Sequence, residues 1–85
     1  MVNVIFSAAY AVLPDLLRER REARGLSQRE LARLMRRSPS HIGRIEARQR
    51  RVEVIEFCRW VEALDGDPTE AFTELRRRLA AGGQV

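Results

Sequence analysis

The chain has 85 residues, of which 45% are hydrophobic, with a single cysteine and a formal net charge of +4. This length predicts one small domain, and the lone Cys58 excludes an intrachain disulfide and fits a reducing cytoplasm. Residues 1–13 are apolar but lack a basic start and are too short to cross a bilayer, so we expect a cytoplasmic protein without a membrane segment.

The positive charge is concentrated in the middle of the chain. All 16 basic residues are arginine, and residues 18–51 hold twelve of them against four glutamates, a net of +8. Residues 52–85 hold four arginines against seven acids, a net of −3. Codon bias alone would explain the lack of lysine, but guanidinium groups also match phosphates and guanine edges. The uneven charge therefore predicts one face for a polyanion and another for a different contact.

The N-terminal residues predict a single helix, which can begin either at Ser7 or near Pro14. Residues 2–6 are β-branched and aromatic and could form a short strand. Ser7 can cap a helix that runs toward Arg24. Pro14 either kinks this helix or marks the beginning of its stable part. Gly25 is expected to end it, because a helix often closes on a left-handed residue.

A second helix is expected from Ser27. Glu30 stands three residues later, which makes a Ser-x-x-Glu capping box. The pair Arg36-Arg37 closes the helix, where positive charge complements the helix dipole. Helical spacing places on its buried side Leu31, Leu34 and Met35.

A third helix follows after a very short turn. Ser38 can cap it, and Pro39 occupies its first turn. Its expected inward residues are Ile42 and Ile45. A basic connection over residues 47–52 leads to the next helix.

A fourth helix is expected over residues 53–64 and a fifth from about residue 68. Asp67 is the expected cap of the fifth helix, with Pro68 at its first position and Glu70 reaching back. The expected apolar stripe of the fourth helix is Val54, Phe57, Cys58, Val61 and Leu64, flanked by Ile55 and Trp60. The expected apolar side of the fifth is Ala71, Phe72, Leu75 and Leu79.

The elements together predict an all-α, five-helix fold with a possible short N-terminal strand. We expect one domain over residues 1–85. Within it, residues 1–12 form an N-terminal extension, 13–67 the first four helices, 68–81 the C-terminal helix and 82–85 a tail.

The second and third helices suggest DNA binding. A turn this short forces the two helices to cross steeply, so that one can rest on the phosphate backbone while the other enters the major groove. The residues expected to face base edges are Pro39, Ser40, His41, Gly43 and Arg44. Arg44 is the best candidate, because an outward arginine can bind guanine O6 and N7 together. Gly43 would allow the helix to approach closely.

Phosphate contacts are expected from two places. Gln28 lies at the exposed start of the second helix, whose free amides favour anions. The connection after the third helix supplies Arg48, Arg50 and Arg51. For this basic run, a merely solvated loop is the alternative.

Several of these segments resemble the Cro/repressor-type (XRE) helix-turn-helix family. The similar segments are Gly25–Ala32, Ile42–Glu46, Arg50–Phe57 and Ala63–Pro68, and the likeness runs over about residues 13–72. The resemblance implies a repressor-like five-helix domain that binds double-stranded DNA as a homodimer on a two-fold operator. It also implies a structural ion pair between Arg21 and Glu46.

Two positions depart from the family pattern. The family's turn usually has glycine followed by an apolar residue, where this chain has Arg36 and Arg37. A left-handed arginine is strained. Pro39 replaces a residue that often reads bases, so specificity should shift to Ser40, His41 and Arg44.

Dimerisation is expected because one short recognition helix reads few bases. The expected contact uses surplus apolar residues, although these could instead complete a monomer core. The candidates are Val4, Phe6, Tyr10, Ile55, Trp60, Phe72 and Leu79.

The sequence favours one class of function over two others. The first is a sequence-specific transcriptional regulator, expected to be a repressor that needs no cofactor or metal. The alternative is the antitoxin of a toxin–antitoxin pair, which would add a protein partner. An enzyme is not expected, because one histidine and one cysteine make no metal cluster, and neither a phosphate loop nor a nucleophile elbow is found.

Overall fold

The computed structural model describes residues 7–82 as an all-α fold. Within this range the helices are α1 (Ala8–Ala23), α2 (Gln28–Met35), α3 (Pro39–Glu46), α4 (Val54–Ala63) and α5 (Pro68–Gly82). The all-α fold predicted from the sequence is confirmed. The strand considered for residues 2–6 lies outside the described residues, as do Val4 and Phe6.

The helices begin where serine side chains cap them. Ser7 Oγ accepts a hydrogen bond from the backbone N–H of Tyr10, and Ser38 Oγ accepts one from His41. Ser27 and Glu30 form the complete capping box. Capping satisfies amides that a helix start otherwise leaves without a partner, so these serines fix where α1, α2 and α3 begin.

Helix α1 runs without interruption through Pro14, from its cap at Ser7. Its first turns occupy part of the stretch that the sequence suggested as an extension. Pro14 is buried, and a proline in a helix interior removes one backbone hydrogen bond. The Tyr10 hydroxyl accepts a hydrogen bond from the Val52 backbone N–H at 3.1 Å, which ties this first half of α1 to the loop before α4.

Trp60 lies at the centre of the core, and its side chain is 0% exposed. Its indole Nε1 donates a hydrogen bond to the Leu17 carbonyl at 3.2 Å. The prediction that Trp60 contributes to a dimer contact is therefore wrong for this conformation, because the monomer itself covers the ring. The fully buried side chains around it include Leu17, Leu31, Ile42, Ile45 and Val61.

Two of the apolar stripes expected from the sequence differ in the structure. Helix α4 turns Phe57, Trp60 and Val61 inward, while Val54 is 75% exposed. On α2, Leu34 is exposed and Ala32 is buried instead. Helical periodicity identifies an apolar side but fixes its rotation only roughly when apolar residues cover more than half the circumference.

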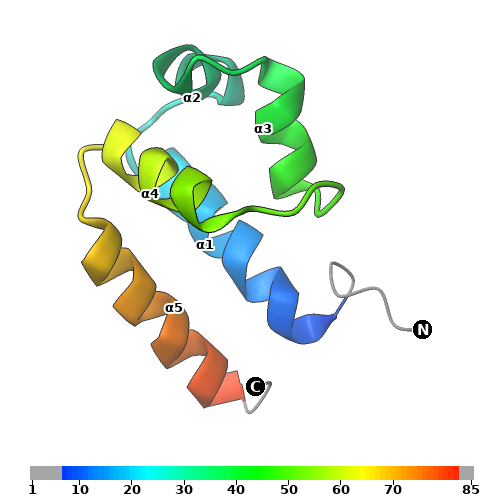
Figure 1. The fold of residues 1–85 in the computed structure, drawn as a ribbon, viewed down its shortest axis with the longest axis vertical. Coiled ribbons are helices and arrows are strands. Elements are labelled where there is room, and N and C mark those ends of the chain that lie inside the picture. Colours follow the sequence, from blue (N-terminus) through cyan, green and yellow to red (C-terminus); the bar gives the residue numbers. More distant parts are fainter. Residues whose placement is uncertain (1–6, 83–85) are drawn as a thin grey trace.

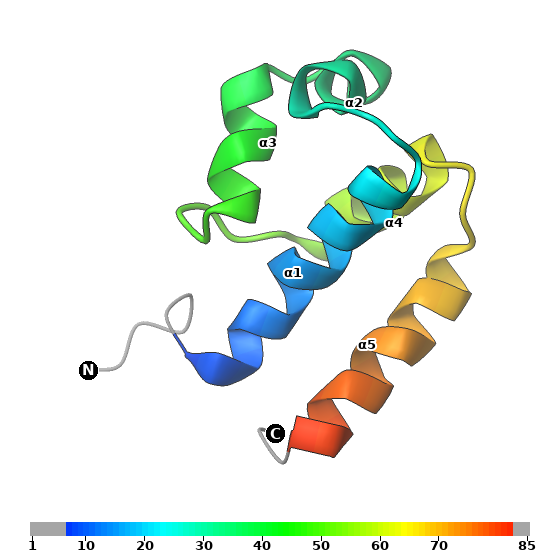
Figure 2. The same ribbon diagram turned by 180° about the vertical axis from the view of Figure 1, so that it is seen from behind.

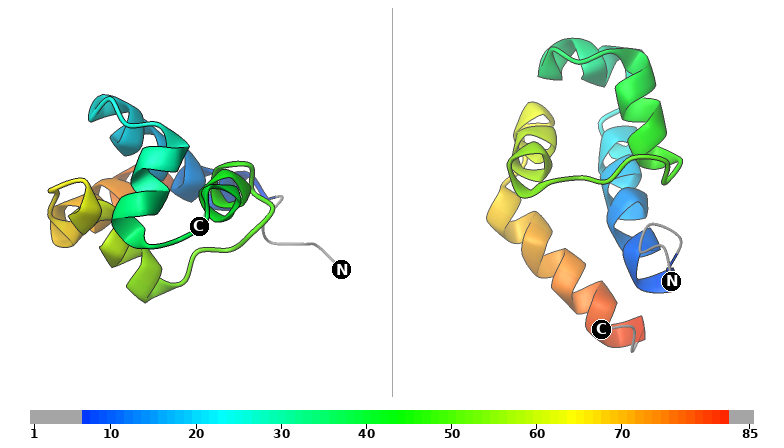
Figure 3. Two further views of the ribbon diagram at one scale, coloured as in Figure 1. Left: turned by 90° about the horizontal axis from the view of Figure 1, so that it is seen from above. Right: turned by 45° about the vertical axis from the view of Figure 1, so that its right-hand side comes forward.

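The helices are arranged toward two opposite ends of the molecule. Helices α2 and α3 form one end, whereas α1 and α5 lie side by side and extend toward the other (Figures 1 and 2). Helix α4 packs between them, against α1, α2 and α5. In the right-hand view of Figure 3, α2 lies at the top, and α1 and α5 run toward the bottom, where they come closer together. No helix among the described residues is long and apolar enough to span a membrane.

Candidate nucleic-acid interface

Helix α3 is firmly seated on its inner side. Ile42 and Ile45 are both 0% exposed, and they pack into the core with Leu31 of α2. Helices α2 and α3 meet at a steep angle through a turn of residues 36–38 (Figure 1). The inner residues therefore hold α3 so that its opposite side faces solvent.

The turn before α3 has the geometry that the sequence left in doubt. Arg36 adopts a left-handed conformation, with φ 56° and ψ 45°. The Arg37 backbone N–H donates to the Ala32 carbonyl at 2.9 Å, and that of Arg36 donates to the Arg33 carbonyl at 3.2 Å. These two bonds are the pair that closes a helix on a left-handed residue. The turn thus forms without the glycine usual at this position.

The outer side of α3 carries the residues predicted to face bases. Pro39, Ser40 and Arg44 are exposed. Ser40 Oγ lies 3.1 Å from Ser38 Oγ, within hydrogen-bonding distance. Arg44 has no ion-pair partner among the described residues, so its guanidinium is available for a base or a phosphate.

His41 is placed differently from its neighbours. Its side chain is 14% exposed, and its Nε2 atom lies 2.5 Å from Glu56 Oε2 on α4. The Arg37 Nε atom lies 3.5 Å from the same carboxylate oxygen. Sequence reasoning identified His41 but missed Glu56, because nothing in the spacing of residues 41 and 56 indicates that they meet.

Gly43 has a structural role that the sequence did not suggest. A Cβ atom at this position would lie 3.2 Å from Oε1 of Gln28. Gln28 Nε2 in turn donates to Glu46 Oε1 at 2.9 Å. The small residue at 43 therefore makes room for Gln28, and the Gln28 amide is partly engaged within the protein.

Arg21 and Glu46 form the ion pair that the family resemblance implied. Arg21 Nε donates to Glu46 Oε2 at 2.6 Å, and Nη2 donates to Glu46 Oε1 at 2.9 Å. Arg21 Nη1 also donates to the Leu26 carbonyl at 2.6 Å. The hydrogen bond to Glu46 raises the pKa of Arg21. This two-point contact links α1 to the end of α3 and fixes the orientation of α3.

The arginines of the basic connection after α3 are of two kinds. Arg48 is half-buried, adopts φ 65°, and lies 3.9 Å from the Asp15 carboxylate of α1. Arg50 and Arg51 are exposed, without an ion-pair partner in the part of the chain that the structure describes. A hollow of about 410 Å³ lies between this connection, α3 and α4. Its lining residues are Arg37, His41, Arg50, Glu53, Ile55, Glu56 and Arg59.

Comparisons with known proteins agree with this geometry. A helix-turn-helix domain family model matches residues 13–72. An XRE-family like protein from Pseudomonas syringae is 36% identical, with 88% of this chain and 92% of that chain covered and a TM-score of 0.79. The restriction-modification controller protein C.AhdI from Aeromonas hydrophila is 38% identical, with 72% of this chain and 92% of that chain covered and a TM-score of 0.66.

A third solved structure shares the fold at lower identity. The clp gene regulator ClgR from Corynebacterium glutamicum is 23% identical, with 91% of this chain and 82% of that chain covered and a TM-score of 0.76. Among curated proteins, none matches the chain significantly. The chain belongs to the XRE-type helix-turn-helix family, and it is a DNA-binding transcriptional regulator.

Proposed function

We propose that the protein is a homodimeric repressor that reads a palindromic operator through α3. The observation that carries this proposal is the division of α3 into a buried side and an exposed side. Ile42 and Ile45 are anchored in the core, while Ser40 and Arg44 project outward. A recognition helix needs this arrangement to enter a major groove.

The charges on α3 and on the connection that follows it support the proposal. Arg44, Arg50 and Arg51 are exposed and make no internal ion pair. Arginines in such positions replace counterions on the DNA backbone, so binding should weaken as salt rises. Arg48 and Gln28 have contacts within the protein, but each keeps further N–H donors that could bind a phosphate.

An exposed apolar surface supports the homodimer. We name the α4–α5 apolar face by its residues Val54, Phe57, Phe72 and Leu75, which line one groove together with Leu13 and Val52. Val54 and Phe72 are 75% and 53% exposed in the monomer. Large apolar side chains that are exposed together mark contact sites, and a second copy carries the same face, as a two-fold interface requires.

The similarity to solved regulators supports the same proposal. One of the similar structures is a restriction-modification controller protein, 38% identical over 72% of this chain. By analogy, we propose that this chain also controls transcription from a specific operator. Blocking a promoter is the simplest action for a domain of this size, because DNA occupancy alone is then sufficient.

Selection of bound sites from random duplex DNA tests this function. We expect a palindromic consensus whose half-sites lie about one helical turn apart, roughly 34 Å. Arg44→Ala should then weaken binding to that site by roughly 1–3 kcal/mol and relax the preference at one base position in each half-site.

Arg50→Ala provides the contrast in the same assay. If Arg50 contacts a phosphate, its replacement should reduce the magnitude of the slope of log affinity against log salt by about one. The base preference should stay unchanged. Arg76, exposed on α5 without an ion pair among the described residues, supplies a control substitution to alanine. Failure to enrich any sequence at low ionic strength would contradict the proposed function.

A further inference from the structure

Glu56 connects α4 to the helix-turn-helix at two points. Its side chain is 8% exposed, and it lies in the first turn of α4. One oxygen, Oε2, lies 2.5 Å from His41 Nε2 on α3 and 3.5 Å from Arg37 Nε in the turn. A buried carboxylate needs such partners, because an unpaired charge in the interior is costly. Glu56 therefore belongs structurally to the recognition unit, although it comes from a different helix.

The contact determines which ring nitrogen of His41 carries a proton. An ionised carboxylate can only accept hydrogen bonds, so Nε2 must be the N–H donor. The other nitrogen, Nδ1, has no hydrogen-bond partner among the described residues. In the neutral ring Nδ1 is an acceptor, and in the protonated ring it becomes a donor. The nitrogen left for an outside group can thus reverse its hydrogen-bonding character.

We propose that Glu56 is a positioning residue that makes His41 a proton-dependent reader of DNA. This inference rests on the proposed function, because it assigns a role to one residue of the same interface. With a neutral ring, the Nδ1 acceptor fits the exocyclic amino groups of adenine and cytosine. With a protonated ring, the Nδ1 donor fits guanine O6 or N7, or a phosphate oxygen.

The surroundings of His41 set the direction of the effect. The charged groups around the same hollow are Arg37 from the turn, Arg50 and Glu53 from the connection, and Glu56 and Arg59 from α4. Three arginines face two glutamates, so in free protein these charges oppose one another. Duplex DNA adds phosphates beside the ring, and negative charge favours the protonated form. Binding should therefore take up a proton, and affinity should rise as pH falls through the range in which histidine titrates.

The ring of His41 can be observed directly, because it is the only histidine in the chain. Nitrogen-15 chemical shifts of the free protein at neutral pH should show the proton on Nε2. Glu56→Gln should weaken this preference, because an amide can donate as well as accept. Glu62→Gln, an exposed acid elsewhere on α4, should leave the shifts unchanged. A neutral ring that carries its proton on Nδ1 instead of Nε2 in the native protein would overturn the proposal, whether or not the protein binds DNA.

Site selection at about pH 8 and about pH 5.5 tests the consequence for DNA, since histidine changes charge between these values. We expect the wild-type preference at one base position per half-site to move from a base with an amino group toward guanine, with roughly a fivefold or greater change in discrimination. His41→Gln should abolish this pH dependence, Glu56→Gln should reduce it, and Glu62→Gln should retain it.

The two measurements separate the possible failures. An identical wild-type consensus at both pH values would overturn the proposal while leaving the proposed function intact. A full pH-dependent shift that persists in Glu56→Gln would remove Glu56 from the proposal. Normal ring shifts without any duplex binding would instead contradict the proposed function.

Discussion

Arg36 shows how a single residue can hold a conformation that its side chain disfavours. The helix-turn-helix needs a left-handed residue at the end of α2, and Arg36 supplies it with φ 56°. A left-handed conformation costs a residue with a Cβ about 1–2 kcal/mol. Because α2 and α3 are both packed against the core, the turn between them must adopt this conformation, and the strain at Arg36 remains.

Arg36→Gly should therefore stabilise the protein by about 1 kcal/mol, because glycine adopts this conformation without the steric penalty but loses more entropy on folding. Urea unfolding measures the change in the free energy of unfolding. Arg33→Gly, within α2, is the matched control and should destabilise by about 1 kcal/mol. Equal destabilisation by both changes would show that Arg36 carries no strain.

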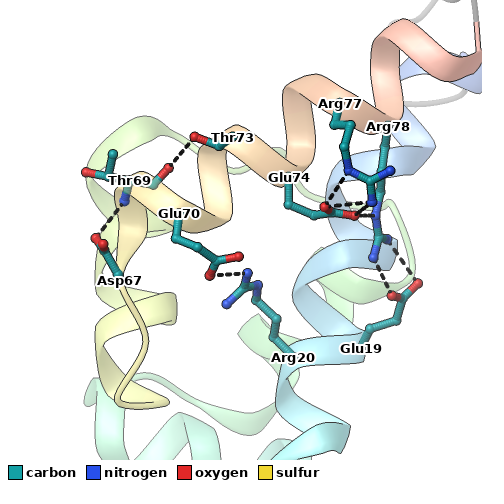
Figure 4. A network of polar contacts seen from close by, with 9 residues as sticks. All are labelled: Glu19, Arg20, Asp67, Thr69, Glu70, Thr73, Glu74, Arg77 and Arg78. Carbon is teal, nitrogen blue, oxygen red and sulfur yellow. Dashed lines mark hydrogen bonds and ion pairs between the residues drawn. The ribbon is translucent and has the colours of Figure 1, made fainter.

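Helix α5 is attached to the rest of the molecule mainly by charged groups. Ala71 is its only buried residue within the described range. Figure 4 shows the polar network between α1 and α5. Arg20 Nη2 lies 2.7 Å from Glu70 Oε1, and Arg78 Nη2 lies 2.9 Å from Glu19 Oε1. Such exposed pairs contribute little individually and are weakened by salt, so we expect α5 to be the least protected of the five helices.

Glu74 makes α5 sensitive to acid through ion pairs within the helix, to Arg77 and Arg78. Hydrogen bonds from Arg78 and then from Arg77 lower the pKa of its carboxyl group. A lowered pKa means that the stabilisation is present at neutral pH and is lost as pH falls below the ordinary glutamate range, about 4.3. Amide hydrogen exchange should therefore show α5 losing protection on acidification before α3 does.

Glu74→Gln should reproduce part of this loss at neutral pH and make α5 less sensitive to further acid. Glu62→Gln, which removes an exposed carboxylate of α4 without an ion pair in the described part of the chain, should leave α5 unchanged. Protection of α5 that is independent of both pH and Glu74 would show that apolar packing, rather than charge, holds the helix.

The size of the whole molecule suits a two-fold complex on DNA. Its radius of gyration is 12.5 Å and its extents are 34 × 28 × 21 Å. Two such bodies in contact can place their recognition helices about 34 Å apart, the distance between successive major-groove faces. Of the predicted dimer residues, Ile55 and Phe72 are exposed, while Tyr10 and Leu79 are half-buried. The α4–α5 apolar face remains the surface best suited to a second copy.

Phe72→Glu should abolish the proposed dimer while leaving the fold intact, because Phe72 is largely exposed in the monomer and a charge cannot be buried cheaply between two copies. Sedimentation should then show a monomer, and affinity for a full operator should fall by roughly 100-fold or more as the second contact is lost.

Thr73→Glu, which adds the same charge at the next exposed position of α5, is the control and should remain dimeric. Trp60 emission should stay constant on dilution, because the indole is in the core of each monomer, and it should change only on unfolding. An unchanged mass for Phe72→Glu would place the dimer contact elsewhere. A wild-type monomer that pairs only with a different protein would favour the antitoxin alternative.

Local signals in the sequence predicted most of the helix boundaries. The three serine caps and the Ser27–Glu30 capping box act through side chains within three residues of the amide that they satisfy. Gly25 was correctly placed at a helix end, with φ 70°. The equivalent left-handed residues Arg36 and Arg48 carry no such local signal, because tertiary packing imposes their conformation. Aspartate adopts it more readily, as at Asp65.

The sequence by itself determined the helical fold, the family and the helix-turn-helix segment, since each depends on local spacing and on short-range chemistry. Only the tertiary structure decided that Trp60 is core rather than surface and that Val54 is exposed. It also decided that Glu56 reaches His41. These outcomes depend on the rotation of each helix about its axis and on which distant side chains then meet, and neither is set by the spacing of residues along one helix.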